Sequence, residues 1–131
     1  MKESPKISEA EWEVMRVVWR RYPIAGAEVI AALSKTNRDW HPKTVRTLLG
    51  RLVKKAALKA EQEKRGNVYT PLVTERECLA TASESFLERF FGGSLKPMLA
   101  YFAEQKKLTP KDLDELHRIL GGRKDDKRRT E

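Results

Sequence analysis

The sequence predicts a mainly α-helical (α+β) fold in which three helices precede a small β-hairpin and further helices follow it. Two observations predict this fold. Apolar residues recur at helical spacing along most of the chain, and several of these stretches begin with a capping signal. The helical spacing gives way to an alternation of apolar or small residues with charged ones over residues 58–64. At 131 residues the chain has room for one domain, or for one small domain with an appendage.

Two helices are predicted before residue 36. Ser8 and Glu11 form a capping box, in which each side chain accepts a hydrogen bond from the backbone amide of the other residue. A helix should therefore begin near residue 9 and end before Pro23. A second helix is expected from about Gly26 to Lys35, with a weak start because Ala25 has no side-chain oxygen that could cap it.

A third helix is predicted after a polar turn from Asn37 to His41, with Pro42 in the first helical position. Its apolar residues keep helical spacing throughout and are Val45, Leu48, Leu49, Leu52, Val53 and Ala56. The alternating segment 58–64 and the strand that follows should form a hairpin with a basic tip at Lys64 and Arg65. Three helices followed by such a hairpin are typical of a winged helix-turn-helix domain.

The remaining residues predict three short amphipathic helices. The first begins at a capping box formed by Thr74 and Glu77 and ends at two glycines, Gly92 and Gly93. The second covers about residues 95–102, and the third begins at Thr109 and Pro110 and should stop at Gly121 and Gly122.

We therefore expect three parts in the chain. Residues 1–72 form the winged-helix domain, residues 73–121 form a helical region, and residues 122–131 form a disordered basic tail.

The side of the third helix opposite its apolar residues is basic. A helical wheel places Lys43, Thr47, Gly50, Arg51 and Lys54 there, with Thr44 and Arg46 on the flanks. Lys and Arg at these positions can reach DNA phosphates or guanine edges, and Thr can contact a base edge or a thymine methyl group. The alternative is a basic face that only contacts water, but the basic hairpin tip and the net charge of +7 over residues 1–72 favour nucleic acid.

The apolar faces of the last three helices have little else in the chain to pack against. We expect them to form a two-fold homodimer; folding back onto the winged domain is the alternative. The residues expected in this dimer interface are Phe86, Leu87, Phe90, Phe91, Leu95, Met98, Leu99, Phe102, Leu113, Leu116 and Leu120. A dimer would place two DNA-reading helices on half-sites about 34 to 36 Å apart.

Other classes of protein are not indicated. The single cysteine, Cys78, cannot form an intramolecular disulfide and fits a reducing compartment, and no apolar run is long enough for a signal peptide or a membrane span. We therefore expect a cytoplasmic protein that is not inserted in a membrane. His41 and His117 do not form a metal site with Cys78, and no catalytic triad or phosphate loop can be assembled, so neither a cofactor nor an enzymatic activity is expected.

Several segments together resemble the penicillinase-repressor family (BlaI and MecI type), which is related to the copper-responsive CopY repressors. They are ISEAEWEVMRVVW, SKTNRDWHPKTVRTLLGRLVKKAAL, NVYTP and SFLERFFGGSLKPMLAYFAEQKKL. The resemblance covers about residues 7–121 and implies a winged-helix homodimer that binds double-stranded operators of the TACA/TGTA type and represses transcription. It assigns DNA contacts to Lys43, Thr44, Arg46 and Thr47, to which the basic face adds Arg51 and Lys54, and it makes Lys64 and Arg65 the wing tip.

The resemblance also implies a route of control. In antibiotic-responsive members, a membrane metalloprotease sensor signals for cleavage at an Asn-Phe bond within the dimerisation helices. The matching pair here is Tyr101 and Phe102, so the first residue departs from the family pattern. Copper-responsive relatives carry a cysteine-rich C-terminal motif, whereas this chain ends in RKDDKRRTE. The sequence does not indicate which genes are regulated or which signal induces them. The alternative function is a winged-helix module that binds another protein and has no specific DNA binding.

Overall fold

The computed structural model describes the backbone of residues 4–36 and 39–130, and the side chains of this part up to residue 121. The turn expected from Asn37 therefore begins outside the described residues. The chain forms two compact units, Met1–Ser85 and Phe86–Glu131. Each unit is described by itself below.

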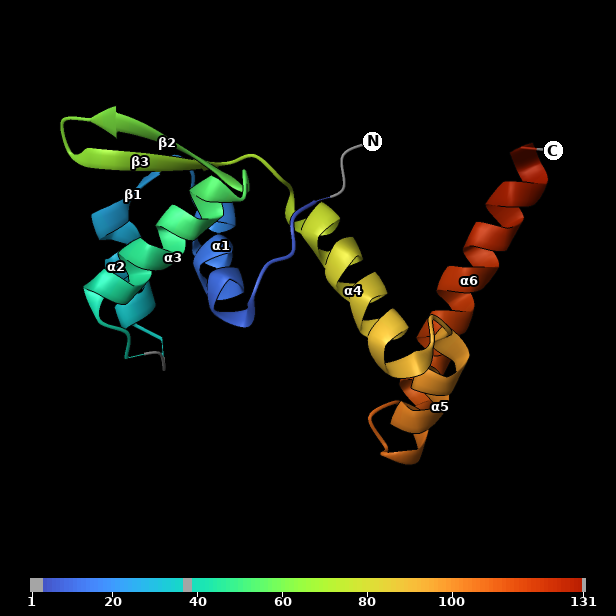
Figure 1. Cartoon of the computed structure of the whole chain (residues 1–131). Helices are drawn as coiled ribbons and strands as arrows, with labels where there is room; N and C mark the ends of the chain where they lie inside the picture. Colours follow the sequence, from blue (N-terminus) through green and yellow to red (C-terminus); the bar gives the residue numbers. More distant parts are fainter. Residues whose placement is uncertain (1–3, 37–38, 131) are drawn as a thin grey trace. The chain divides into compact units, whose positions relative to one another are not determined.

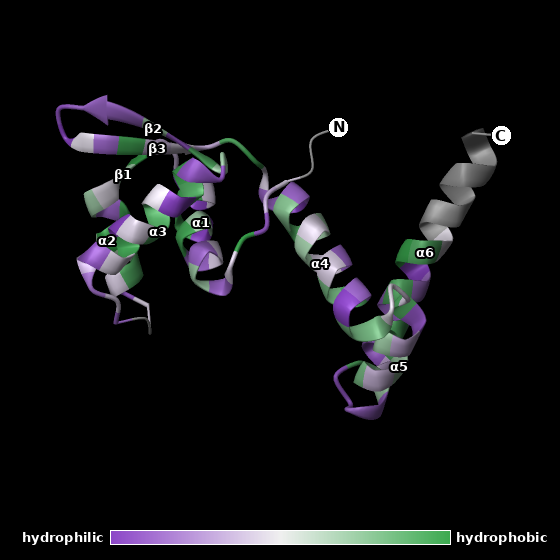
Figure 2. Ribbon diagram, viewed as in Figure 1, coloured by the Kyte–Doolittle hydropathy of each residue, from purple (hydrophilic) through white to green (hydrophobic). Residues whose placement is uncertain are grey.

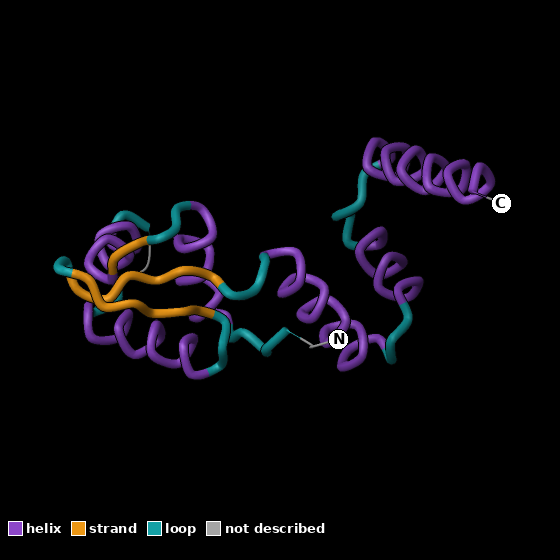
Figure 3. Tube along the Cα trace, turned by 90° about the horizontal axis from the view of Figure 1, so that it is seen from above, coloured by secondary structure: helices purple, strands orange, loops and turns teal. Residues whose placement is uncertain are grey.

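The first unit contains three complete helices, a three-stranded antiparallel sheet and the beginning of a fourth helix (Figure 1). Its complete elements in chain order are α1 (Glu9–Arg20), β1 (Ile24–Ala25), α2 (Gly26–Ser34), α3 (Pro42–Lys54), β2 (Leu58–Glu63) and β3 (Gly66–Pro71). The strand order is β1-β3-β2, and the predicted order of three helices and a hairpin is confirmed. Figure 3 shows the two hairpin strands running side by side.

Strand β1 was not predicted. It has two residues, which are too few to show an alternating pattern, and it exists because Ile24 pairs with Tyr69 and Ala25 pairs with Val68. The strand is thus a product of tertiary pairing rather than of local sequence.

At the start of each helix of this unit, a side chain accepts a hydrogen bond from at least one backbone amide. Ser8 and Glu11 form the predicted capping box of α1. At α2, Ala25 has no side-chain oxygen to cap the helix, and only the reciprocal half of a capping box is present: the Glu28 carboxylate accepts a 3.0 Å hydrogen bond from the Ala25 amide. At α3, the Nδ1 atom of His41 accepts from the Lys43 amide at 3.1 Å.

The core lies between the three helices and the sheet. Helix α3 contributes four of the six predicted apolar residues, which are Val45, Leu48, Leu49 and Leu52. The other two assignments are wrong. Val53 is 37% exposed, and Ala56 lies beyond the helix end with a φ of 63°, so Ala57 takes the buried place instead. A residue with positive φ ends the helix, so the helical spacing no longer predicts which side chains are buried after it.

An ion pair between the buried Glu11 and the partly exposed Lys55 joins the start of α1 to the end of α3. The side chain of Glu11 is almost completely buried, and its carboxylate binds Lys55 at the C-terminus of α3. The Lys55 Nζ atom also donates to the carbonyl oxygen of Lys6 at 2.9 Å. Burial alone would raise the pKa of Glu11, but the hydrogen bonds from Lys55 and Ser8 hold it below the ordinary carboxylate value.

The hairpin has the predicted two-residue tip at Lys64 and Arg65. Glu63 pairs with Gly66 across this tip, and Gly66 has a φ of 99°, a conformation that a residue with a Cβ rarely adopts. The tip is therefore narrow and has a defined register.

The chain continues into α4 (Glu75–Phe91), α5 (Leu95–Glu104) and α6 (Pro110–Thr130). Thr74 accepts from the Glu77 amide at 3.0 Å, and Thr109 and Asp112 form a reciprocal capping box at α6. Helix α4 ends before Gly92 and Gly93, as predicted, and both glycines have positive φ. Figure 2 shows hydrophobic residues along α5 and at the end of α4.

The units meet inside α4, after Ser85, rather than at the expected boundary at residue 72. The first turns of α4 belong with the winged part because Cys78 is buried there, and because Ser4 hydrogen-bonds to Thr81 and to the carbonyl oxygen of Glu77. Burial raises the pKa of the Cys78 thiol, which fits a small buried side chain.

The predicted end of the last helix at Gly121 and Gly122 is wrong, because α6 continues to Thr130. The segment expected as a disordered tail is therefore helical up to that residue. Glycine lowers helix propensity by about 1 kcal/mol relative to alanine, but unlike proline it keeps its amide donor and does not break the backbone ladder.

Candidate nucleic-acid interface

The predicted basic face exists on α3. The six side chains assigned to it are all exposed, namely Lys43, Thr44, Arg46, Thr47, Arg51 and Lys54. The buried residues Val45, Leu49 and Leu52 hold the helix against the core and turn this face outward. Its four cations pair with no carboxylate in the described part of the chain. They are thus available to an anionic partner.

Thr47 is less free than its exposure suggests. Its hydroxyl donates a 3.0 Å hydrogen bond to the carbonyl oxygen of Lys43, one turn earlier in α3. The proton of the hydroxyl is therefore occupied, and Thr47 offers a methyl group and an acceptor oxygen to the solvent.

The two residues of the wing tip differ in their surroundings. Arg65 forms an ion pair with Glu28 of α2, with 3.0 Å between Nη1 and Oε1, and lies 3.6 Å from a carboxylate oxygen of Glu63. Lys64 is exposed and pairs with no carboxylate among the described residues. The structure thus fixes one of the two predicted wing cations and leaves the other extended toward solvent.

Glu28 connects three elements, a role that was not predicted from the sequence. Its carboxylate accepts from the amide of Ala25 and pairs with Arg65 of the wing and with Arg21 at the end of α1, the last at 2.8 Å. The hydrogen bond from Ala25, together with the two arginines, lowers the pKa of Glu28. The available signal was a glutamate in the first turn of a helix that lacks a capping side chain.

The second unit has no buried side chain among its described residues. Of the predicted interface residues, five are exposed, namely Phe86, Phe90, Leu95, Leu113 and Leu120, and the other six are partly buried. Phe86 contacts both Phe90 and Phe91, with ring centroids 5.1 and 5.9 Å apart. Ile119 is 60% exposed and was not predicted, although its spacing fits the face of Leu116 and Leu120.

The predicted cleavage pair lies within α5. Tyr101 is half exposed, Phe102 is partly buried, and their rings contact each other at 5.6 Å. The bond between them is part of a helix, so a protease would reach it only after that helix has unwound.

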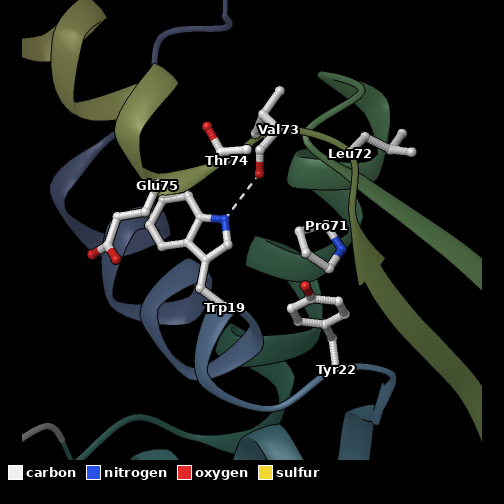
Figure 4. Close-up of a pocket in the computed structure, with 7 residues that line it drawn as sticks. All are labelled: Trp19, Tyr22, Pro71, Leu72, Val73, Thr74 and Glu75. Atoms are coloured by element: carbon white, nitrogen blue, oxygen red, sulfur yellow. Dashed lines mark hydrogen bonds between the residues drawn. The ribbon is translucent and has the colours of Figure 1, made fainter.

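A pocket of about 340 Å³ lies in the first unit where the chain leaves the hairpin (Figure 4). The indole nitrogen of Trp19 donates to the carbonyl oxygen of Val73 at 3.0 Å, and Tyr22 and Leu72 are more than half exposed beside it. The hydrogen bond attaches the segment before α4 to α1.

No group of three or more His, Cys, Asp or Glu side chains in the described part of the chain could hold a metal ion. None of its helices is both long and apolar enough to cross a membrane.

The model of the family described as penicillinase repressor matches residues 7–122, which is most of the chain. This chain belongs to the penicillinase-repressor family. Within this family, it is 44% identical over 128 residues to the penicillinase repressor of Bacillus licheniformis, covering 98% of this chain and 99% of that protein. It is 31% identical over 115 residues to the methicillin resistance regulatory protein MecI of Staphylococcus aureus (strain N315), and the match covers 88% of this chain and 93% of that protein.

Solved structures of the family match the winged part. The solution structure of the DNA-binding domain of the repressor BlaI is 51% identical, with a TM-score of 0.52, and the match covers 59% of this chain and 93% of that one. The monomeric form of Bacillus licheniformis BlaI in complex with the blaP half-operator is 49% identical, with a TM-score of 0.51 and the same coverage. The first unit therefore has the winged-helix fold of a penicillinase repressor.

Proposed function

We propose that this protein is a transcriptional repressor that binds palindromic operator DNA of the TACA/TGTA type as a homodimer. The observation that carries the proposal is the exposed face of α3, where four cations have no carboxylate partner among the described residues. A family relative of about half-identical sequence has been solved in complex with a half-operator, and the match covers this part of the chain. The residues proposed to contact DNA are Lys43, Thr44, Arg46, Thr47, Arg51, Lys54, Lys64 and Arg65.

The test is a fluorescence anisotropy titration of the full chain with two labelled duplexes, one with a TACA/TGTA dyad and one with the same bases scrambled. The dyad should bind more tightly. Both affinities should fall steeply between about 50 and 200 mM salt, because each neutralised phosphate releases counterions. Equal affinity for the two duplexes, or an affinity that does not depend on salt, would contradict specific operator binding, and no affinity for either duplex would favour a winged module that binds protein.

The homodimer is proposed from the second unit. Its described side chains include none that is buried, and large apolar residues such as Phe90 and Leu120 are about 60% exposed. Exposed apolar patches of this kind mark interaction surfaces. Pairing two copies through α4, α5 and α6 would bury them and present two α3 helices to one duplex.

Loss of repression is proposed to follow from proteolysis of the bond between Tyr101 and Phe102, under the control of a membrane metalloprotease sensor. The resemblance places the family's cleavage bond here, with Tyr101 in place of asparagine, and the half-exposed Tyr101 side chain would be within reach of a protease once α5 has unwound. Cutting this bond would separate α6 from the rest of the interface and weaken the dimer. Mass spectrometry of the protein from induced cells should find a fragment that ends at residue 101. An intact chain in derepressed cells would contradict this route.

We further propose that the protein acts in the cytoplasm, where its operator DNA is. The single cysteine, which is buried, fits a reducing compartment.

A further inference from the structure

A hollow of about 420 Å³ opens between α3, the wing and the first turn of α2. Arg46 and Gly50 line it on the side of α3, and Arg65 and Asn67 line it on the side of the hairpin. None of the residues that line it is acidic. The hollow therefore has an arginine on two of its sides, next to the face proposed to contact DNA, and of the two only Arg65 is paired with carboxylates of the described residues, those of Glu28 and Glu63.

Gly50 is not explained by the packing of the chain itself. A Cβ atom at this position would have no neighbour within 4 Å, whereas one at Gly26 would contact Tyr69 at 3.5 Å. In the middle of α3, glycine costs about 1 kcal/mol of helix propensity relative to alanine. A residue that weakens its helix and makes room for no other side chain indicates close approach by a bound partner.

Arg65 is held at the edge of this hollow. Its guanidinium lies 3.0 Å from the carboxylate of Glu28, which the Ala25 amide fixes in turn. The wing tip is thereby attached to α2, and the width of the hollow does not depend on the hairpin alone. An arginine that is already placed loses less side-chain freedom when it binds a phosphate.

We propose that this hollow receives a backbone phosphate of the bound DNA, with Gly50 allowing close approach, Arg46 and Arg65 supplying charge, and Glu28 acting as a positioning residue for Arg65. The inference rests on the proposed function. A contact of this kind carries no sequence information, so it should contribute to the binding of operator and scrambled DNA alike.

The first test substitutes Gly50 in the full chain. Gly50→Ala and Gly50→Leu should leave the thermal midpoint unchanged or raise it, because both residues favour helix and the space is open. Affinity for both duplexes should fall, by more than about tenfold for Gly50→Leu if the phosphate contact is lost. Higher stability combined with weaker binding cannot come from damage to the fold.

The controls carry comparable changes elsewhere. Gly121→Ala adds a methyl group to an exposed glycine of α6, and Ala80→Leu adds bulk to an exposed position of α4. Neither should weaken binding to the scrambled duplex. If Gly50→Leu binds both duplexes as tightly as the wild type does, the phosphate site is excluded. A wild-type chain that does not prefer the operator overturns the proposed function instead, since the Gly50 effect is measured on scrambled DNA.

The second test isolates the role of Glu28. Glu28→Gln keeps an acceptor for the Ala25 amide, and Glu61→Gln removes the same charge from an exposed ion pair with Lys59 on the wing. Both variants gain the same general attraction to DNA. Glu28→Gln should bind scrambled DNA about two- to fivefold more weakly than Glu61→Gln, the range expected for an exposed ion pair.

This difference should vanish when Arg65→Gln is added to both variants, because Glu28 is proposed to act through Arg65. Equal binding of the two single variants would overturn the positioning role. A difference that persists without Arg65 would also overturn it.

Discussion

At the scale of single residues, Thr47 has its hydroxyl proton occupied by the carbonyl oxygen of Lys43. If it contributes to operator recognition, the methyl group is the part that faces the groove, where it can contact a thymine methyl. Thr47→Val should therefore keep most of the preference for the TACA/TGTA dyad, whereas in Thr47→Ser this preference should fall several-fold. The ratio of affinities for operator and scrambled duplexes measures this, and the reverse order would show that the hydroxyl is the recognising group.

Lys54 is the control for that comparison, since we expect its exposed ammonium group to neutralise a phosphate rather than to contact a base. Lys54→Gln should lower the affinity for both duplexes alike. The dependence of this affinity on salt should become shallower by about one released counterion. A selective loss of operator binding in Lys54→Gln would assign it a base contact instead.

Glu11 stabilises the end of α3 through its ion pair with Lys55. Glu11→Gln should lower the free energy of unfolding by about 1 to 3 kcal/mol, as expected when a hydrogen bond to a charged group is lost in a buried place. Because the pKa of Glu11 is lowered in the folded chain, its contribution is fully present above the ordinary carboxylate value of 4.5 and is lost as the pH falls through the lower folded value.

Urea denaturation at a series of pH values checks this prediction. The stability of the wild type should decline below about pH 4.5, and Glu11→Gln should show a weaker decline over the same range. Identical pH profiles would mean that Glu11 does not govern the acid sensitivity.

Residues differ in how far the sequence predicts their roles. The face of α3 follows from local spacing, so all six of its proposed DNA contacts were predicted and are exposed. Glu28 could not be predicted as the partner of Arg65, because the two are 37 positions apart and only the folded hairpin brings them together.

At the scale of elements, the end of α3 shows a conflict between residue and conformation. Ala56 has a φ of 63°, in the left-handed region where glycine is favoured, and the amide of Ala57 donates to the carbonyl oxygen of Leu52. Ala56→Gly should raise the free energy of unfolding by about 1 kcal/mol, because it removes the steric cost of the side chain. Denaturant unfolding measures this, and a loss of stability would show that the methyl group packs usefully.

The wing provides the opposite case. Gly66 has a φ of 99° with open space around it, so Gly66→Ala should destabilise the first unit by about 1 to 2 kcal/mol through backbone strain alone. The same measurement checks it, and an unchanged stability would mean that the tip can adopt another turn.

Elements with a strong local signal were predicted, and those that depend on context were not. Capping boxes and apolar spacing located the helix starts at Ser8, Thr74 and Thr109. Strand β1 has no local signal, and the two glycines in α6 were read as a stop although they only weaken the helix. Propensity alone decides neither case.

At the scale of the whole molecule, the chain separates a unit that carries a core from one that does not. Every buried side chain among the described residues lies at or before Cys78, and the exposed apolar residues of the second unit need a partner. Residues 1–85 therefore contain what is needed to fold alone, and the rest is proposed to join two such units on one operator.

The sequence predicted a helical second region but not where the first unit ends. Alternation and turn signals stop at residue 72, whereas the contacts that keep the start of α4 in the first unit involve Ser4 and Thr81, which are far apart in the chain. Long-range contacts of this kind leave no local pattern.

The most direct test of the central claim is sedimentation equilibrium of the full chain and of residues 1–85, each alone and with a TACA/TGTA dyad duplex. The account predicts that the full chain is a dimer that binds the dyad with two subunits. Residues 1–85 should be monomeric and should bind the same duplex at least about a hundredfold more weakly, because the second half-site is no longer tethered. A monomeric full chain, or equal affinity for both forms, would contradict the account.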